Sequence, residues 1–148
     1  MQRSYVTTPD SLDPETSIPI TCMDATKGES RYLLALHDLA AGGHQTLQAE
    51  LARHVGVSQP TALEMVRRLR GLGLIAEGSL GLTAAGTSAA LVLSSRREAA
   101  EVLIREVLGV PEAQVAGEAE SLAVTLSPLL AHRLVAWRSR HAAVNHGG

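Results

Sequence analysis

Residues 55–75, VGVSQPTALEMVRRLRGLGLI, constrain the fold more than any other stretch of this 148-residue sequence. Gly56 suits the positive φ of a tight turn, Ser58 can cap the helix that follows, and Pro60 fits its first turn. The apolar positions of that helix share one face, at Ala62, Val66 and Leu69. Another amphipathic helix, TLQAELARHV, ends just before the turn. Two helices joined by a short glycine-containing turn predict a helix-turn-helix.

The flanking segments extend this motif to a winged helix-turn-helix. Apolar residues recur at helical spacing from Lys27 to Ala41, which predicts a further helix before the pair. After the second helix, residues 74–76 and 80–83 are two short apolar runs around Gly78-Ser79, typical of a small hairpin. We therefore expect a winged helix-turn-helix DNA-binding domain over residues 26–84.

The rest of the chain favours helices. Aromatic residues make up only 2% of the sequence against 45% hydrophobic residues overall, so a core of Leu, Val and Ala is expected. Residues 85–141 show long apolar helical patterns with more apolar surface than a monomer would hide, which predicts an α-helical dimerisation domain. Residues 142–148 are expected to be a frayed tail, and residues 1–25 a flexible N-terminal arm. The predicted fold class is mainly α.

Composition excludes several classes of protein. One cysteine excludes an internal disulfide framework, and no apolar run approaches the length of a membrane span. The N-terminus does not have the pattern of a signal peptide, so a cytoplasmic protein is expected. The six histidines are scattered, with no nucleophile elbow or phosphate-binding glycine loop, so the chain is not expected to be an enzyme. Although the net charge is −2, the middle segment over residues 26–83 is mildly basic and has arginines at 67, 68 and 70.

The pattern ESRYLLALHDL…TLQAELARHVGVSQPTALEMVRRLRGLGLI…GLTAAG…LSPLLAHRLVAW resembles the diphtheria toxin repressor / manganese transport regulator family, over roughly residues 26–140. The resemblance implies a homodimeric transcriptional regulator, by default a repressor, that binds a pseudo-palindromic double-stranded operator. Glu64 replaces a glutamine of the toxin-repressor branch, which implies a different operator sequence. The candidate DNA-binding residues are Ser58, Gln59, Pro60, Thr61, Glu64, Arg67 and Arg68.

The resemblance also implies regulation by a bound metal ion, but the chain departs from this family at the metal-ligand positions. Residues that cannot ligate a metal or do so poorly occupy most of them: Thr26, Arg97, Ala116, Ala123 and Val124. Carboxylates remain only at Glu29, Glu101 and Glu120, as remnants of the ligand set. Three carboxylates without an imidazole, beside an arginine, make a poor site for a transition metal. We therefore expect no metal cofactor and regulation without the family's usual metal activation.

Arg97 suggests a substitute for the metal. A guanidinium keeps its charge at any working pH and presents a planar fork to carboxylates. We expect Arg97 to occupy roughly the place of the cation and to pair with Glu101 and Glu120.

Three alternatives remain open at this point. Soft ligands from Cys22 and Met23, together with Asp24, could complete a rearranged site for Fe(II) or Mn(II) in a metal-responsive repressor. A winged helix can also serve protein–protein contact without binding DNA. The small side chains at Ala116, Ala123 and Val124 would also permit a small apolar ligand.

Overall fold

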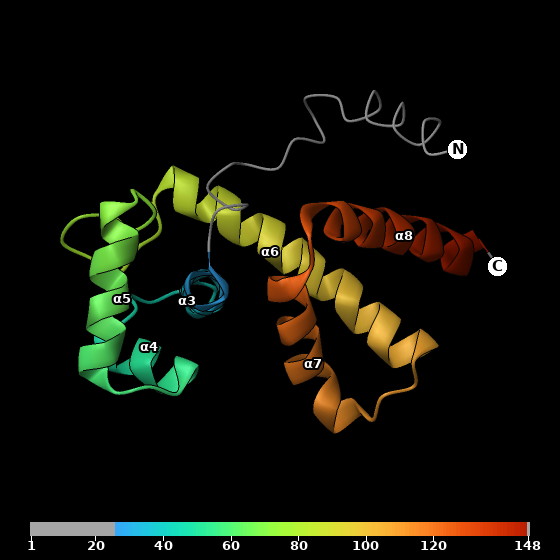
Figure 1. Cartoon of the computed structure of the whole chain (residues 1–148), viewed down its shortest axis with the longest axis horizontal. Coiled ribbons are helices and arrows are strands. Elements are labelled where there is room, and N and C mark those ends of the chain that lie inside the picture. The colour runs from blue at the N-terminus through green and yellow to red at the C-terminus, as the bar shows by residue number, and fades with distance from the viewer. Residues whose placement is uncertain (1–25, 148) are drawn as a thin grey trace.

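The computed structural model describes residues 26–147, and the regular elements within that range are all helices. Figure 1 shows α6 running across the molecule, with α3, α4 and α5 around one end and α7 and α8 around the other. The elements are, in chain order, α3 (Lys27–Ala40), α4 (Gln48–Val55), α5 (Gln59–Gly71), α6 (Ala84–Val102), a π-helical turn (Leu103–Val107), α7 (Glu112–Thr125) and α8 (Pro128–Gly147). The predicted class, mainly α with a winged helix-turn-helix followed by a helical part, is confirmed.

Local signals define the helix-turn-helix as predicted. Gly56 ends α4 with φ of 86°, in the left-handed region that glycine adopts without strain. Ser58 caps α5, because its side chain accepts a hydrogen bond from the backbone N–H of Thr61. The helices then pack their aliphatic faces into one core, to which each contributes fully buried leucines: Leu33, Leu34, Leu36, Leu51 and Leu69.

The wing is smaller than predicted. Two short strands were expected, but in the described chain a single antiparallel bridge, between Ile75 and Leu82, joins the two arms of the loop. Arg70 of α5 reaches into this loop and donates hydrogen bonds to the carbonyls of Ala76 and Ser79, at 2.9 and 2.7 Å. These bonds use carbonyl groups that a longer strand ladder would otherwise satisfy, so the wing is held by a side chain instead of by a sheet.

α6 links two hydrophobic cores. Its first half contributes Ala89, Ala90 and Leu93 to the core of α3, α4 and α5. Its second half contributes Ala100 to a separate core, formed with Ile104 of the π-helical turn and with Val115 and Ala119 of α7. Alanines along α6 allow α7 to approach its backbone closely, which explains why helices of such low side-chain volume still form a core.

The C-terminal boundary differs from the prediction. Residues 142–148 were expected to fray, yet α8 continues through Gly147. Ala142 and Ala143 have high helix propensity, and the first strong helix breakers are the two final glycines. The predicted arm over residues 1–25 lies outside the described residues. Within residues 26–147 no helix is long and apolar enough to cross a membrane.

Candidate nucleic-acid interface

The first turn of α5 presents an exposed polar surface. Ser58, Gln59, Pro60, Thr61 and Glu64 are all exposed. The hydroxyl of Ser58 bonds to that of Thr61 at 2.9 Å as well as capping the helix, so both side chains are held in place. The N-terminus of a helix carries free N–H groups and a partial positive charge, which suits contact with phosphate. The structure therefore brings these five predicted residues together on one accessible surface.

The three arginines of α5 have different environments, which the sequence did not reveal. Arg67 is exposed, and its side chain makes no ion pair or hydrogen bond with another described residue. Arg68 pairs through its Nε with Glu29 of α3 at 2.5 Å. Arg70 holds the carbonyls of the wing. Arg67 is thus the arginine whose whole guanidinium is available to a phosphate, and the other two are used at least partly inside the protein.

Glu29 is a structural residue of α3. Its carboxylate is only 2% exposed and has both oxygens occupied, because Oε2 accepts from the backbone N–H of Thr26 and Oε1 from Arg68. Thr26 accepts in return from the N–H of Glu29, which completes a capping box at the start of the helix. Glu29, one of the three carboxylates at the family's ligand positions, therefore joins α3 to α5.

Arg97 binds a different carboxylate from the two predicted. Its Nη1 and Nη2 donate to the two carboxylate oxygens of Asp38 on α3, each at 2.8 Å. Glu101 and Glu120 lie near enough to help raise the pKa of Arg97, but the hydrogen bonds to Asp38 contribute most. The predicted pairing of Arg97 with Glu101 and Glu120 is wrong. Asp38, 59 residues away in sequence, offered no local signal for this contact.

The pair changes the titration of Asp38. Burial alone would raise the pKa of this carboxyl group. The hydrogen bonds and charge of Arg97, with smaller contributions from His54 and His37, outweigh burial and hold the pKa below its ordinary value. Asp38 is therefore ionised at neutral pH and can accept both bonds from the guanidinium.

The other two carboxylates at ligand positions, Glu101 and Glu120, each lie beside a different arginine. Glu120 lies 3.7 Å from Nε of Arg31, and Glu101 lies 3.7 Å from Nη2 of Arg105. Within residues 26–147 no group of three or more histidine, cysteine, aspartate or glutamate side chains is placed to hold a metal ion. The described residues alone therefore do not fit a metal centre. Cys22, Met23 and Asp24, the alternative ligands, lie outside the described residues.

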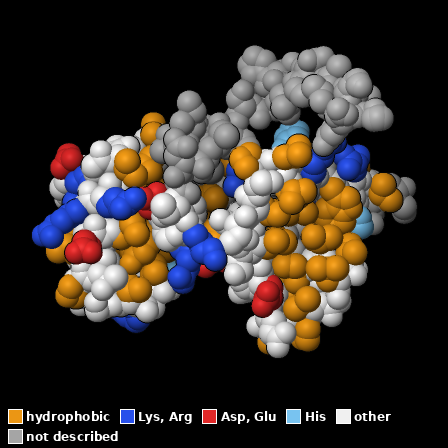
Figure 2. Space-filling view, in the orientation of Figure 1, with side chains coloured by type: hydrophobic (Ala, Val, Ile, Leu, Met, Phe, Trp, Pro, Cys, Tyr) orange, Lys and Arg blue, Asp and Glu red, His pale blue; other side chains and the backbone are white. Residues whose placement is uncertain are grey.

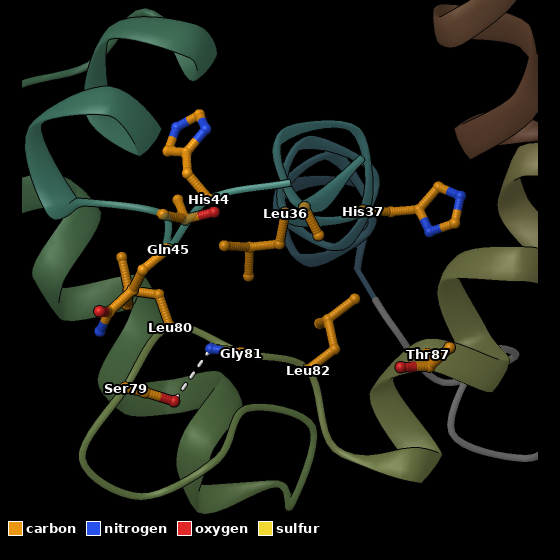
Figure 3. Close-up of a pocket in the computed structure, with 11 residues that line it drawn as sticks. Leu36, His37, His44, Gln45, Ser79, Leu80, Gly81, Leu82 and Thr87 are labelled. Carbon is orange, nitrogen blue, oxygen red and sulfur yellow. Dashed lines mark hydrogen bonds between the residues drawn. The ribbon is translucent and has the colours of Figure 1, made fainter. Parts of the chain in front are cut away.

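The three positions suggested for a small apolar ligand have different environments. Ala123 is fully buried, Val124 packs against the first core and Ala116 is exposed. A cavity of about 460 Å³ lies instead beneath the wing, where Figure 3 shows Leu36 and Leu82 converging from α3 and the wing. The N–H of Gly81 donates to the hydroxyl of Ser79 at its edge. Leu80 and Leu82 pack against the first core beside this space, and Arg70 adds its two hydrogen bonds to the wing carbonyls.

Comparison with known proteins places the chain in a family. It is 31% identical over 107 residues to the iron-dependent repressor IdeR of Mycobacterium tuberculosis, covering 70% of this chain and 46% of that protein. The corresponding protein of Mycobacterium leprae is 32% identical over 91 residues, covering 60% and 40%. Among solved structures, a manganese-dependent transcriptional repressor in complex with manganese matches with a TM-score of 0.67 and 31% identity, over 75% of this chain and 52% of that one. The manganese regulator SloR matches with a TM-score of 0.66 and 25% identity, over 74% and 52%. No family model matches the sequence.

The chain belongs to the diphtheria toxin repressor / manganese transport regulator family.

Membership of the family corrects one prediction from the sequence. The absence of a metal cofactor was expected, but the curated relatives are iron-dependent repressors and one structural relative contains manganese. The prediction that the protein takes no metal cofactor is therefore wrong. It relied on comparing the ligand positions one by one, and the three carboxylates that remained, Glu29, Glu101 and Glu120, each lie beside an arginine in this structure. The chain spans about half the length of the relatives it matches, from 40% to 52%.

Proposed function

We propose that this chain is the operator-binding part of a transcriptional repressor that recognises double-stranded DNA through α5 and the wing. The observation that carries the proposal is the exposed first turn of α5, with Ser58 and Thr61 fixed to each other and Arg67 open to solvent. A helix of this kind enters the major groove with its N-terminal residues at the base edges. Glu64 would select a cytosine amine and reject phosphate, so it is a candidate for sequence discrimination.

We further propose that the protein acts as a homodimer, with a DNA-binding domain over residues 26–84 and a dimerisation domain over residues 85–141. Figure 2 shows hydrophobic side chains gathered on the lobe formed by α7 and α8. Several large apolar side chains are more than half exposed in this part of the chain: Val107, Leu108, Leu129, Leu130 and Val144. Apolar surface of this kind is typical of an interface between subunits. A two-fold dimer would present two α5 helices to a palindromic operator in the cytoplasm, where such DNA is found.

Regulation by Fe(II) or Mn(II) is the second part of this proposal, because the relatives are named for these metals. Since residues 26–147 do not bring three ligands together, we propose that Cys22, Met23 and Asp24 contribute to the site. Thiolate and thioether groups beside a carboxylate form a softer donor set than the remaining glutamates offer. A Cys22→Ala variant tests this assignment through its metal affinity, measured by isothermal titration calorimetry.

The deciding experiment is binding to labelled DNA from the protein's own promoter region, followed by fluorescence anisotropy. Thr61→Ala is expected to weaken binding roughly 10-fold or more, since base and phosphate contacts at the groove each contribute about 1–3 kcal/mol. Leu72→Glu, at an exposed position that caps the other end of α5, is the control and is expected to bind normally. The same titration after chelation, and again with Fe(II) or Mn(II), measures the metal response.

Two outcomes would contradict the proposal. Binding that is equally tight to unrelated DNA, and insensitive to Thr61→Ala, would exclude operator recognition by α5. An absence of binding with and without metal would favour the alternative role of a winged helix in protein–protein contact. Dimerisation is tested separately by sedimentation, where Leu130→Glu should yield monomer and Leu72→Glu should not.

A further inference from the structure

A polar layer separates the two hydrophobic cores along α6. The first core ends at Leu93 and the second begins at Ala100. Between them lie Arg96, which is only 6% exposed, and Arg97, whose side chain is 18% exposed. Nη2 of Arg96 has no hydrogen-bond partner among the described residues. Along α6 the apolar packing is therefore interrupted between the two cores, where Ala99 adds only one methyl group, and Val124 of α7 reaches the first core from the other side.

Two ion pairs cross this layer to α3. Arg97 holds Asp38, near the C-terminal end of α3, with two parallel hydrogen bonds of 2.8 Å. Arg31, near the other end of α3, lies 3.7 Å from Glu120 of α7, with both side chains more exposed. Hydrophobic contact is non-directional, whereas a guanidinium fork on a carboxylate fixes both distance and angle. The pair between Arg97 and Asp38 is thus the contact best suited to set the orientation of α3 on α6.

An ion pair also links α3 to α5. Glu29, at the start of α3, is buried and bound to Arg68 of α5. A connected route therefore runs from Arg97 on α6 through Asp38 and Glu29 on α3 to Arg68 on α5. Each end of α3 thus makes a charged hydrogen bond, one to α5 and one to α6.

We propose that Arg97 and Asp38 are positioning residues that fix the angle between the helix-turn-helix and the α7–α8 part of the molecule. In a dimer this angle sets the spacing of the two α5 helices, and only this last step rests on the proposed function. Neither residue belongs to the candidate DNA-binding residues or to the exposed large apolar side chains. The effect of the pair on DNA binding would therefore be entirely geometric.

The test measures a distance within one chain that changes with this angle. Spin labels are placed at Glu77→Cys in the wing and Glu118→Cys on α7, both exposed positions, in a chain carrying Cys22→Ser. Labelled protein is diluted with excess unlabelled protein, so that pulsed electron–electron double resonance reports distances within one chain. Asp38→Asn, Arg97→Lys and Arg97→Met are compared with Arg105→Met. Arg105 makes a similar two-bond pair with Glu112, but within the second part of the molecule alone.

The distance distribution is expected to be narrow in the parent and in Arg105→Met. It should become about twofold wider, or move, in Asp38→Asn and Arg97→Lys, because neither variant can form the two-bond fork. Arg97→Lys separates geometry from charge: an unchanged distribution in this variant would overturn the positioning role. Circular dichroism checks folding, and the two conservative variants carry the test if Arg97→Met unfolds.

Operator binding provides the second readout. The same substitutions at Arg97 and Asp38, made in the chain that keeps Cys22 and carries no labels, should weaken binding about 10-fold with an unchanged dependence on salt, because the candidate phosphate-binding side chains are all still present. If the parent binds no DNA at all, the proposed function fails while the distance measurement still decides the positioning role. Unchanged distances in all variants would overturn the inference, whatever the DNA results.

Discussion

The three arginines of α5 should respond differently to substitution, although they lie within four residues of one another. Arg67 is free in the described chain, whereas Arg70 donates two hydrogen bonds to wing carbonyls at 2.9 and 2.7 Å. Arg67→Gln removes a candidate phosphate contact without touching the fold. Arg70→Lys keeps the charge but cannot span both carbonyls.

The magnitudes follow from these roles. Removing one arginine from a phosphate lowers the slope of log affinity against log salt by about 0.9, so in a dimer Arg67→Gln should lower it by about 1.8. Arg70→Lys should leave that slope unchanged. A hydrogen bond from a charged donor contributes about 1.5–3 kcal/mol to the stability of the wing, and partial exposure to solvent reduces this contribution. Loss of one of the two bonds from Arg70 should therefore displace the wing and weaken DNA binding about 10-fold.

The assay is fluorescence anisotropy with operator DNA at four or five salt concentrations, with thermal denaturation of each variant in parallel. Arg70→Lys is expected to lower the melting temperature, while Arg67→Gln is expected to leave it unchanged. A reduced salt slope in Arg70→Lys, or an unchanged slope in Arg67→Gln, would refute the assignment of roles to these two side chains.

Other predictions concern stability. Gly86→Ala should destabilise the fold by more than about 3 kcal/mol by denaturant titration, because its Cβ would lie 2.0 Å from the carbonyl oxygen of Leu74; Gly117→Ala, at an open position, is the control. Arg68→Met should cost about 1–3 kcal/mol by leaving the buried carboxylate of Glu29 with one partner fewer, and a cost no greater than for an exposed arginine would contradict this. The stabilisation from Asp38 should be complete above its ordinary pKa of 3.8 and disappear as pH falls below that value, because its pKa is lowered in the folded state. Asp38→Asn should flatten that acid limb of the stability profile, and an unchanged limb would show that other carboxylates cause it.

The helices were predictable from the sequence because their signals are local. Gly56, Ser58 and Pro60 define the turn and the start of α5 by backbone preferences that need no distant partner. The apolar period then places Val66 and Leu69 in the core. These features depend only on residues a few positions apart, and the structure agrees with them.

The side-chain partners were not predictable in the same way. Glu101 and Glu120, the predicted partners of Arg97, are both closer to it in sequence than Asp38, and only the crossing of α3 over α6 brings Asp38 to the guanidinium. Similarly, Arg67 and Arg68 are adjacent on α5, but a turn of about 100° per residue points one to solvent and the other to Glu29. The wing was overestimated because apolar pairs predict strands, whereas Arg70 satisfies the carbonyls instead.

Because α6 is one continuous helix, it restricts where residues can be inserted into the sequence. The helix has 19 residues and belongs to both cores, so it acts as a rigid rod with a fixed rotational phase. One residue inserted between Leu93 and Arg97 would rotate everything beyond it by about 100° and shift it by about 1.5 Å. The second core would then face away from α3, and the proposed dimer would hold its two α5 helices at a different spacing. Insertions are therefore tolerable in the wing loop or after Val107, and α6 can lengthen only by steps close to whole turns.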